Sequence, residues 1–549
     1  MKKTLLYTSL ALAYVGGPVQ AQIAPDAGQT LQQLATPPQQ PTPSQPLLIE
    51  TPRGAVDVPP GGPKVRLKGV TFSGNSVFDA AELTAIISDA LNQDFDLAGL
   101  WTQAERIAAF YRARGYPFVR VFVPAQAFAD GQLRIDILEG RYGRVLPAGD
   151  AFPADAPLPF LAALEPGSLI ESQRLERTML LLEDLPGVKI RPTIEPGREV
   201  GSGDLTVDVQ RESYYDGEVG LDNAGNRYTG DLRARATLHV NSPWRFGDHL
   251  SINGLTTDAG MWLGSLDYEL PLGGSGLRGQ FGYAQTRYAL GKEFSYLDAT
   301  GSARIWTAKA SYPLYRSQPS NLTVSLAYQQ KFLEDRYGNT GSLESKSSQT
   351  LPLSLRFDHR DGMGGGGISY GALTWTVGKL YLDGGLASQD ATTARKDGGF
   401  SKLNLDISRI QKLPGAFTLY GRYSSQWTNK NLDSSERMGL GGVYGVRAYP
   451  MGEASGDTGW MTQVELRYAM GQVAPYVFYD AGQINTNAQP WDANSSASRF
   501  LSGHGLGVRV DYRGWNLDLS LAWRLQGGEA TSDTRQQQPR VWLMGAYRF

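Results

Sequence analysis

The sequence predicts two small α+β domains followed by a transmembrane antiparallel β-barrel of about sixteen strands. Three observations predict this fold class. Helix and strand patterns alternate between residues 63 and 212, apolar residues occupy every second position from Tyr214 onwards, and an export signal precedes both regions. The length agrees, because 549 residues are too many for one ordinary domain.

Residues 1–21 have the order of a secretory signal peptide. Two lysines near the start are followed by an apolar stretch, and Val19 and Ala21 fit a cleavage site before Gln22. No later stretch approaches the roughly 18 consecutive apolar residues of a membrane-spanning helix. An exported chain of this kind is either soluble or a barrel.

Residues 22–62 are rich in Gln, Pro and Ala, a composition typical of an extended linker. A weak helical pattern runs from Asp26 to Ala35. Two interpretations remain open for it, a short helix and a disordered tether.

Residues 63–140 predict a strand, two helices and two further strands, and residues 141–212 repeat this plan. The second unit is expected to have a short helix over residues 157–164. From Tyr214 to the end, no clear helical period is present. Two α/β units of about 75 residues therefore precede the region of alternating residues.

The barrel is expected over residues 213–549. Trp515, Leu517 and Leu519 alternate with polar residues, so one face of that strand is apolar and the other polar. A soluble sandwich shows the same period. Segments of roughly ten or more residues with aromatic side chains near their ends favour a membrane barrel. Such strands must close on themselves, because lipid cannot satisfy free backbone groups.

Composition and motifs exclude several classes of protein. The chain has no cysteine, which rules out disulfides, thiolate metal sites and cysteine nucleophiles, and its net charge of −2 gives no field for nucleic acid. The Gly364–Gly367 run lacks the Lys-Ser/Thr of a phosphate loop. Four histidines are scattered without metal-ligand spacing: His239, His249, His359 and His504. We expect no enzyme, no cofactor and no metal.

Several local patterns are informative in combination. The first unit holds Tyr111, Gly115, Tyr116 and Phe118 just before and in its second strand, and the chain ends on Phe549 in an alternating strand. A long loop between the eleventh and twelfth expected barrel strands, about 428–458, contains a Gly-Gly pair. The same loop contains four consecutive residues of interest, Val446, Arg447, Ala448 and Tyr449, and the thirteenth strand contains Asp480.

These patterns resemble the TpsB family, the two-partner secretion transporters of Gram-negative bacteria. The resemblance covers essentially the whole mature chain in the same order. It implies an N-terminal plug helix, a linker, two polypeptide-transport-associated (POTRA) domains and a sixteen-stranded barrel. It also implies that the POTRA motif residues could bind a partner and that Phe549 is a barrel C-terminal signal.

The resemblance implies that the sixth extracellular loop folds back into the lumen, where Arg447 meets Asp480. An acidic residue is common in the family at the position of Glu465, for which a plain lumen-lining role is the equal alternative. Without the family, Arg447 would be read as a solvated loop charge, and a pair in a wet lumen would contribute modest energy. Ala448 departs from the usual Gly, and alanine is costly there if the site needs a positive φ.

The expected function is export of a secreted TpsA-type partner, unfolded, through the pore. The chain is expected in the outer membrane, with POTRA domains in the periplasm, as a monomer that interacts with lipid and the barrel-assembly machinery. A partner could dock by adding a strand to a sheet edge. The alternatives are an insertase, which usually has three or more POTRA units, and a passive porin, which has no need of the two domains.

Overall fold

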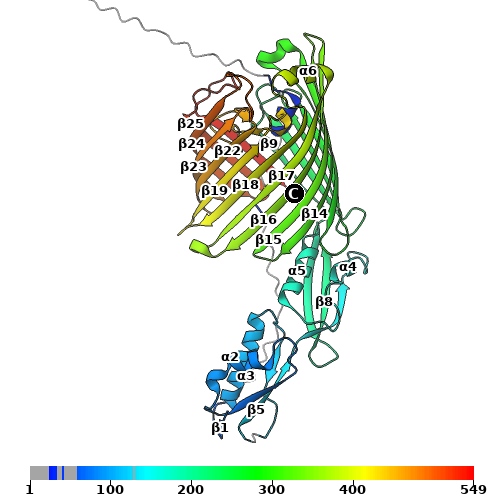
Figure 1. Cartoon of the computed structure of the whole chain (residues 1–549), viewed down its shortest axis with the longest axis vertical. Helices are drawn as coiled ribbons and strands as arrows, with labels where there is room; N and C mark the ends of the chain where they lie inside the picture. The colour runs from blue at the N-terminus through cyan, green and yellow to red at the C-terminus, as the bar shows by residue number, and fades with distance from the viewer. Residues whose placement is uncertain (1–23, 34–39, 42–57, 128–129) are drawn as a thin grey trace, which may run out of the picture.

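The computed structural model describes residues 24–33, 40–41, 58–127 and 130–549. A barrel stands above two small domains that follow one another away from it (Figure 1). The predicted signal peptide lies outside the described residues, as does most of the predicted linker. Among the described residues, no helix is both long and apolar enough to cross a membrane.

The first small domain has the predicted order of strand, two helices and two strands, with a short strand pair added. Its parts are β1 (Val65–Arg66), β2 (Gly69–Ser73), α2 (Ala80–Ile86), η1 (Ser88–Ala90), β3 (Asp94–Phe95), α3 (Leu97–Ala113), β4 (Arg120–Phe122) and β5 (Gln132–Leu138). The main sheet has the order β2-β5-β4. α3 begins at Asp96, whose carboxylate accepts from the Gly99 N–H at 2.8 Å and caps the helix. Both helices pack their apolar faces on the sheet.

The second small domain contains β6 (Arg141–Ala148), α4 (Leu158–Leu161), α5 (Ser172–Glu183), β7 (Val188–Pro196) and β8 (Ser202–Arg211). Its sheet has the order β6-β8-β7. The helix predicted over 157–164 is therefore too long. The chain tightens into a three-residue turn, in which the Leu164 N–H donates to the Leu161 oxygen at 2.9 Å, and this ends α4 early.

The remaining chain forms a closed antiparallel barrel of sixteen strands, as predicted. In order they are β9 (Tyr215–Asp222), β10 (Arg233–Asn241), β11 (His249–Thr257), β12 (Trp262–Pro271), β13 (Arg278–Ala289), β14 (Ala299–Arg316), β15 (Ser320–Tyr337), β16 (Ser342–Asp361), β17 (Gly367–Leu382), β18 (Gly398–Lys412), β19 (Phe417–Thr428), β22 (Thr458–Tyr468), β23 (Val473–Asn485), β24 (Ser498–Tyr512), β25 (Trp515–Gln526) and β26 (Arg540–Arg548). β26 pairs with β9 and closes the ring. Phe549 continues this pairing, because it and Gly217 exchange backbone hydrogen bonds of 3.0 and 3.1 Å.

The alternating pattern sorts side chains between lipid and lumen. Trp515, Leu517 and Leu519 of β25 are all exposed on the outer surface, whereas Ser520 is buried. The apolar residues face outward because the solvent around the wall is lipid, and the polar residues line the interior. This inverts the usual arrangement of a soluble domain.

Two expectations from the sequence are corrected here. A helix, α6 (Gly384–Thr392), lies in the loop after β17, although no helical period was found beyond Tyr214. Asp383 caps it by accepting from the Leu386 N–H at 3.0 Å. The helix buries only Asp390, so it needs no repeating apolar face and left no pattern in the sequence.

The histidines are also less scattered than expected. His239 and His249 stack on neighbouring strands, with Nδ1 and Nε2 3.2 Å apart. The antiparallel register places them diagonally across the β10–β11 pair. Among the described residues, no group of three or more His, Cys, Asp or Glu could hold a metal ion.

The second small domain is seated on the turns at one end of the barrel (Figure 1). Phe246, in the turn between β10 and β11, is partly buried and packs against the core of that domain, with its ring centroid 4.9 Å from that of Phe152. Asp184 accepts from Arg316 Nε and Nη2 at 2.7 and 2.6 Å. Apolar contact and an ion pair therefore cross the boundary at Tyr214 between the second small domain and the barrel.

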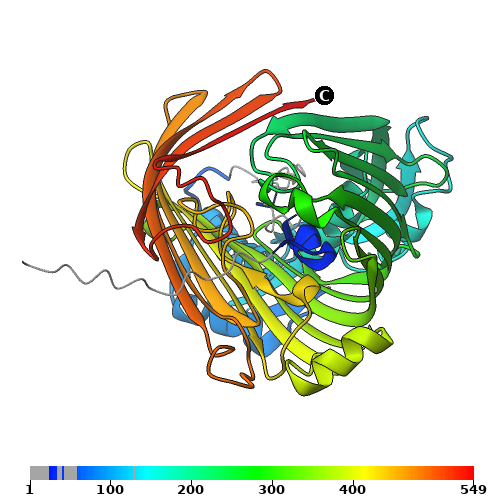
Figure 2. The ribbon, with the colours of Figure 1, turned by 90° about the horizontal axis from the view of Figure 1, so that it is seen from above.

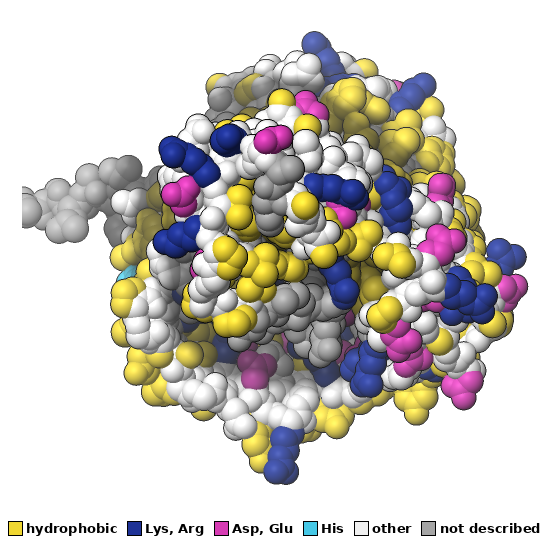
Figure 3. Space-filling model, turned by 90° about the horizontal axis from the view of Figure 1, so that it is seen from below, with side chains coloured by type: hydrophobic (Ala, Val, Ile, Leu, Met, Phe, Trp, Pro, Cys, Tyr) yellow, Lys and Arg dark blue, Asp and Glu magenta, His cyan; other side chains and the backbone are white. Residues whose placement is uncertain are grey.

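Seen from the end of the small domains, basic and acidic side chains are interspersed over the surface (Figure 3). Such a mixed surface carries no extended field of one sign on this face.

Candidate functional site in the barrel lumen

The loop between β19 and β22, residues 429–457, is called loop six here. It contains η4 (Ser434–Glu436), β20 (Met438–Gly439) and β21 (Ser455–Gly456), and β20 pairs with β21. The loop reverses tightly beyond β20, where the Val446 N–H donates to the Leu440 oxygen at 2.7 Å. Gly442 has φ +104°, a conformation that side chains rarely adopt. The turn presents the four predicted residues Val446 to Tyr449 to the barrel wall.

Arg447 is clamped by two neighbouring strands. Its Nε and Nη2 donate to the two Asp480 oxygens at 2.8 and 2.7 Å, and its backbone N–H donates to Asp480 Oδ2 at 3.1 Å. Its Nη1 donates to Glu465 Oε1 at 2.6 Å. The structure thus brings together the predicted loop arginine and both predicted acidic residues. The bidentate fork fixes the orientation of the loop as well as attracting it.

Burial makes this cluster different from the solvated lumen pair that the sequence allowed. Arg447 is 3% exposed, and Asp480 is 0% exposed. Removing one member of a buried charge pair typically costs about 3–5 kcal/mol, because the other charge stays buried without a partner. Breaking this pair should therefore cost far more free energy than breaking a pair that is exposed to water.

Glu465 is held by three arginines. Besides Arg447, Arg467 Nε donates to Oε2 at 2.8 Å, and Arg509 Nη1 donates to the same oxygen at 3.0 Å. Arg509 in turn donates to Asp518 Oδ2 at 2.7 Å. Glu465 therefore connects the loop-six arginine to a charge network on strands β22, β24 and β25.

Aromatic residues complete the seat for the loop. The Arg447 guanidinium lies 3.6 Å from the ring centroid of Phe478, a cation–π contact. The Trp542 indole N–H donates to the Arg447 oxygen at 2.8 Å. Tyr449 is fully buried, and its hydroxyl donates to the Gln526 oxygen at 2.9 Å; Val446 is equally buried. Sequence reasoning missed Trp542, because only the closed barrel brings β26 to this loop. It also missed Phe478, although that residue lies two positions before Asp480 on β23.

Alanine in place of the usual glycine at residue 448 causes no backbone strain. The φ angle of Ala448 is not positive. Its Cβ faces Gly503 on β24, and a Cβ at residue 503 would lie 2.5 Å from it. The methyl group at residue 448 thus fills space that a glycine on the wall leaves open.

A second carboxylate ties loop six to loop eight, residues 527–539 between β25 and β26. Glu453 is fully buried and accepts from the backbone N–H groups of Thr531 and Ser532 at 2.9 and 2.8 Å. Arg499 pairs with it at 2.5 Å. Nothing in the sequence marked this contact, because it joins two loops whose approach only the folded barrel sets.

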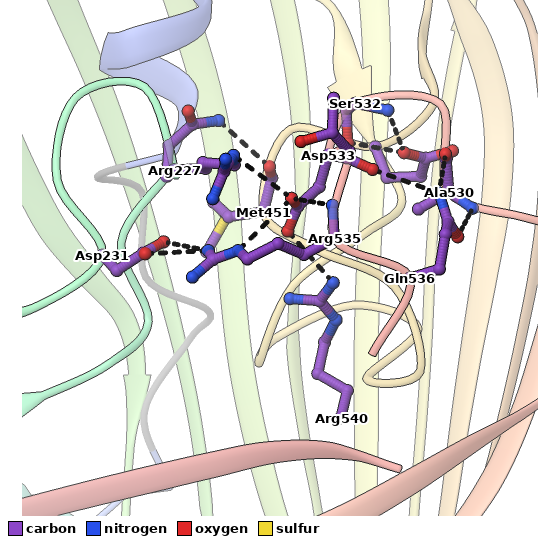
Figure 4. Close-up of polar contacts among 12 residues, drawn as sticks. Arg227, Asp231, Met451, Ala530, Ser532, Asp533, Arg535, Gln536 and Arg540 are labelled. Carbon is purple, nitrogen blue, oxygen red and sulfur yellow. Dashed lines mark hydrogen bonds and ion pairs between the residues drawn. The ribbon is translucent and has the colours of Figure 1, made fainter. Parts of the chain in front are cut away.

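Loop eight is itself held by a buried carboxylate, Asp533. Its partners are Arg540 Nη2 at 3.3 Å, the Arg535 backbone N–H at 2.9 Å and Arg227 Nε at 3.6 Å. Arg535 also pairs with Asp231 at 2.8 Å, and Figure 4 shows these two side chains pointing toward each other. Arg227 and Asp231 lie in the loop that follows β9, so the cluster joins the two ends of the barrel across its seam.

The helix α1 (Ala27–Gln33) lies inside the ring of strands (Figure 2). Asp26 precedes it and pairs with Lys346 at 3.0 Å and with the Ser434 hydroxyl at 2.5 Å. The Ala27 N–H donates to Asp335 Oδ1 at 3.1 Å. Lys346 also pairs with Asp433 of loop six at 2.7 Å. The helix thus contacts both the wall and loop six.

The predicted POTRA motif residues divide between core and surface. Tyr111 is fully buried, its hydroxyl donates to Glu139 Oε1 at 3.1 Å, and burial together with that carboxylate raises its pKa. Gly115 ends α3 with φ +96°, and Tyr116 and Phe118 are partly buried. Phe118 packs against the core of the second domain. Tyr111 has no surface to offer a partner, so its part in the motif is structural.

Two POTRA-like domains below a closed sixteen-stranded barrel, with a long loop clamped in the lumen, define a class of outer-membrane polypeptide transporter. The comparisons give the family. The chain belongs to the haemolysin secretion/activation protein ShlB/FhaC/HecB family, whose profile matches residues 201–510. Residues 65–140 match the ShlB-type POTRA domain.

Curated relatives cover most of the chain at low identity. The hemolysin transporter protein ShlB of Serratia marcescens is 25% identical over 510 residues, covering 90% of this chain and 87% of its own. The heme/hemopexin transporter protein HuxB of Haemophilus influenzae (strain 86-028NP) is 24% identical over 470 residues, covering 83% and 82%.

Solved structures show the same fold. CdiB from Escherichia coli has a TM-score of 0.72 at 20% identity and covers 92% of this chain and 94% of its own. BamA from Haemophilus ducreyi lacking POTRA domains 1–3 has a TM-score of 0.53 at 12% identity, covering 88% and 100%. The protein is therefore a two-partner secretion transporter of the outer membrane, with its POTRA domains in the periplasm and a secreted TpsA-type partner.

Proposed function

We propose that the partner crosses the lumen unfolded and that loop six, clamped through Arg447, shapes the conduit. The observation that carries this proposal is the buried contact of Arg447 with Asp480 and Glu465. It holds an otherwise long loop at one place on the wall. No step in this scheme needs catalysis, and we propose that the chain works without enzymatic activity or a cofactor.

We propose domain limits of 63–140, 141–212 and 213–549 for the two POTRA domains and the barrel. In support, β5 ends at Leu138 and β6 begins at Arg141, and β9 begins at Tyr215. The described helix α1 supports a plug within residues 22–62. A single chain closes the barrel through the β26–β9 pairing, which supports a monomer. We also propose that the barrel-assembly machinery inserts this barrel into lipid.

We propose that the partner first adds a strand to β2 of the first domain. β2 lies at a sheet edge, and its residues Gly69–Ser73 include neither proline nor charge. The edge strand β7 of the second domain contains Pro192, Pro196 and several charged residues, which blunt an edge against pairing. The β2 edge is therefore the better template for an extended segment.

The test uses the absence of cysteine in the chain. Thr71→Cys in β2 and Thr193→Cys in β7 place a single thiol on two exposed edge strands. Each variant is labelled with a benzophenone maleimide in cells that express the secreted exoprotein partner. We expect light-induced cross-links to the exoprotein from residue 71 and few from residue 193. Equal or absent cross-linking at residue 71 would contradict docking on β2.

The relatives named as transporters favour export over the insertase and porin alternatives. The likeness to BamA concerns the fold alone. The discriminating measurement is the amount of exoprotein in the medium with and without the transporter. An insertase would instead change the level of other barrels in the outer membrane.

A further inference from the structure

Two described parts of the N-terminal segment, α1 and Pro41, contact side chains inside the barrel. The helix α1 lies beside loop six, whereas Pro41 lies beside Arg360, whose Nη2 donates to the Pro41 oxygen at 3.1 Å. Arg360 lies at the periplasmic end of β16, because its neighbour His359 pairs with Ser320 beside the turn that contacts the second domain. A basic side chain thus already binds a backbone carbonyl on this wall.

The wall above Arg360 carries two basic side chains without ion-pair partners. Ser354 and Arg356 of β16 line a cavity in the lumen, and so does Ile305 of β14. Lys309 lies four residues after Ile305 on the same strand, so alternation places its side chain on the lumen side as well. Within the part of the chain that the structure describes, neither Lys309 nor Arg356 lies within 4.0 Å of a carboxylate oxygen. Arg356 is exposed to the cavity.

The other charges around this cavity are paired. Lys331 and Lys402 both contact Glu436. The remaining pairs are Arg422 with Asp406, Arg437 with Asp457 and Arg360 with Asp358. Among the charged residues that line the cavity, Arg356 is therefore the one without an ion pair in the described part of the chain. Nearby, Lys309 on β14 and Asp267 on β12 also face the lumen without ion pairs, so two of these three charges are positive.

The space beside these residues is large enough for an extended chain. The cavity has a volume of about 700 Å³ and lies between α1, loop six and strands β14 to β19. Its charged lining residues are Lys331, Arg356, Lys402, Asp406, Arg422 and Arg437. Charge of one sign in a cleft with low-dielectric walls concentrates ligands of the opposite sign.

We propose that the lumen wall around Lys309 and Arg356 is a docking surface for acidic, extended segments of the exported polypeptide. This inference rests on the proposed route through the lumen. Guanidinium and ammonium groups bind both carboxylates and backbone carbonyls. The hydrogen bond from Arg360 to the Pro41 carbonyl is an example of binding to a backbone carbonyl on the same wall. A wet, partly open site keeps each contact weak, so a moving chain can leave as well as enter.

The first test is the ion selectivity of the full-length pore in planar bilayers under a KCl gradient near 0.1 M, where the Debye length is about 10 Å. The variant Lys309→Gln/Arg356→Gln is compared with Arg304→Gln/Lys379→Gln, which removes the same charge from exposed positions on the outer face. We expect chloride preference in the wild type and in the control, and a permeability ratio near one in the lumen variant. A cation-selective wild type, or an unchanged ratio in the lumen variant, would overturn the inference.

The second test uses decaglutamate and decalysine as blockers added from the periplasmic side. Decaglutamate should block the wild type at a concentration at least about tenfold below decalysine, as two charge contacts would give. The lumen variant should lose most of this difference. Equal block by both peptides would overturn the inference. The proposed function would fail separately, by wild-type secretion of exoprotein from well-inserted Arg447 variants.

Discussion

The Trp542 indole donates a hydrogen bond of 2.8 Å to the backbone oxygen of Arg447. The last strand of the barrel therefore holds the backbone of the residue whose guanidinium is clamped by Asp480 of β23 and Glu465 of β22. The tip of loop six is fixed by three strands, two of which lie beside each other. Its position is a property of the closed barrel.

We expect Arg447→Ala to reduce secretion by roughly tenfold or more while the barrel remains inserted. The change leaves Asp480 buried without its partner, at a local cost of about 3–5 kcal/mol, and each 1.4 kcal/mol is a factor of ten in an equilibrium. The strands keep their hydrogen bonds, so insertion should survive. The measurement is secreted exoprotein per inserted transporter, by immunoblot of medium and outer membrane.

Asp480→Ala should reduce secretion as much as Arg447→Ala does. The double variant should secrete no less than either single variant, because both changes remove the same contact. Arg447→Lys serves as the conservative control, since an ammonium keeps the charge but not the fork. Wild-type secretion from well-inserted Arg447→Ala would mean that the buried contact has no part in export.

We expect Gly503→Ala to lower secretion, with partial restoration by Ala448→Gly in the same chain. The added Cβ would lie 2.5 Å from that of Ala448, closer than real Cβ contacts, so the loop tip must shift. Removing the methyl group at residue 448 relieves this contact but not the second one, in which the added Cβ would lie 2.9 Å from the Trp523 oxygen, so restoration is only partial. Ala448→Gly alone is the control and should secrete normally; a double variant as defective as Gly503→Ala would refute this packing account.

Deleting residues 22–50 should raise single-channel conductance in planar bilayers, because α1 lies within the ring of strands. Lys346→Met should raise it less, since it removes the contacts with Asp26 and Asp433 but leaves the helix attached. Trp375→Phe, on the outer face of β17, is the matched control. Unchanged conductance after the deletion would rule out a plugging role and leave the transporter intact.

The barrel fragment Tyr214–Phe549 should still give a heat-modifiable band in detergent, because its sixteen strands pair among themselves. It should also expose Phe246, which the second small domain covers in the full chain. We therefore expect the fragment to aggregate more than the full chain in low detergent and Phe246→Ser to reduce that aggregation. A fragment without any heat-modifiable band would place the folding boundary elsewhere.

In the full chain, Phe246→Ala should loosen the second small domain from the barrel. Loss of a buried phenylalanine typically costs about 3–5 kcal/mol, although only part of that is expected at a partly buried site. Limited proteolysis after Arg211 and before Tyr214 should then become faster, at unchanged barrel heat-modifiability. Trp244→Ala, in the same turn but mostly exposed, is the control.

Much of the site could be predicted where local pattern and family resemblance agreed. The pairing of Arg447 with Asp480 was implied by the family resemblance, and the structure brings the two residues together. Trp542 and Glu453 carried no signal, because their partners are remote in sequence and only barrel closure aligns them. The burial of the cluster was likewise unforeseen, since a lumen residue was expected to be wet.

The sequence by itself determined the class of fold, because the switch from helical to alternating periodicity at Tyr214 and the length of the alternating segments are local properties of the chain. Tertiary structure decided which side chains meet: β26 beside loop six, Phe246 against the neighbouring domain, and Gly503 opposite Ala448. The physical reason is that periodicity fixes which face a residue occupies, whereas register and ring closure fix its neighbours.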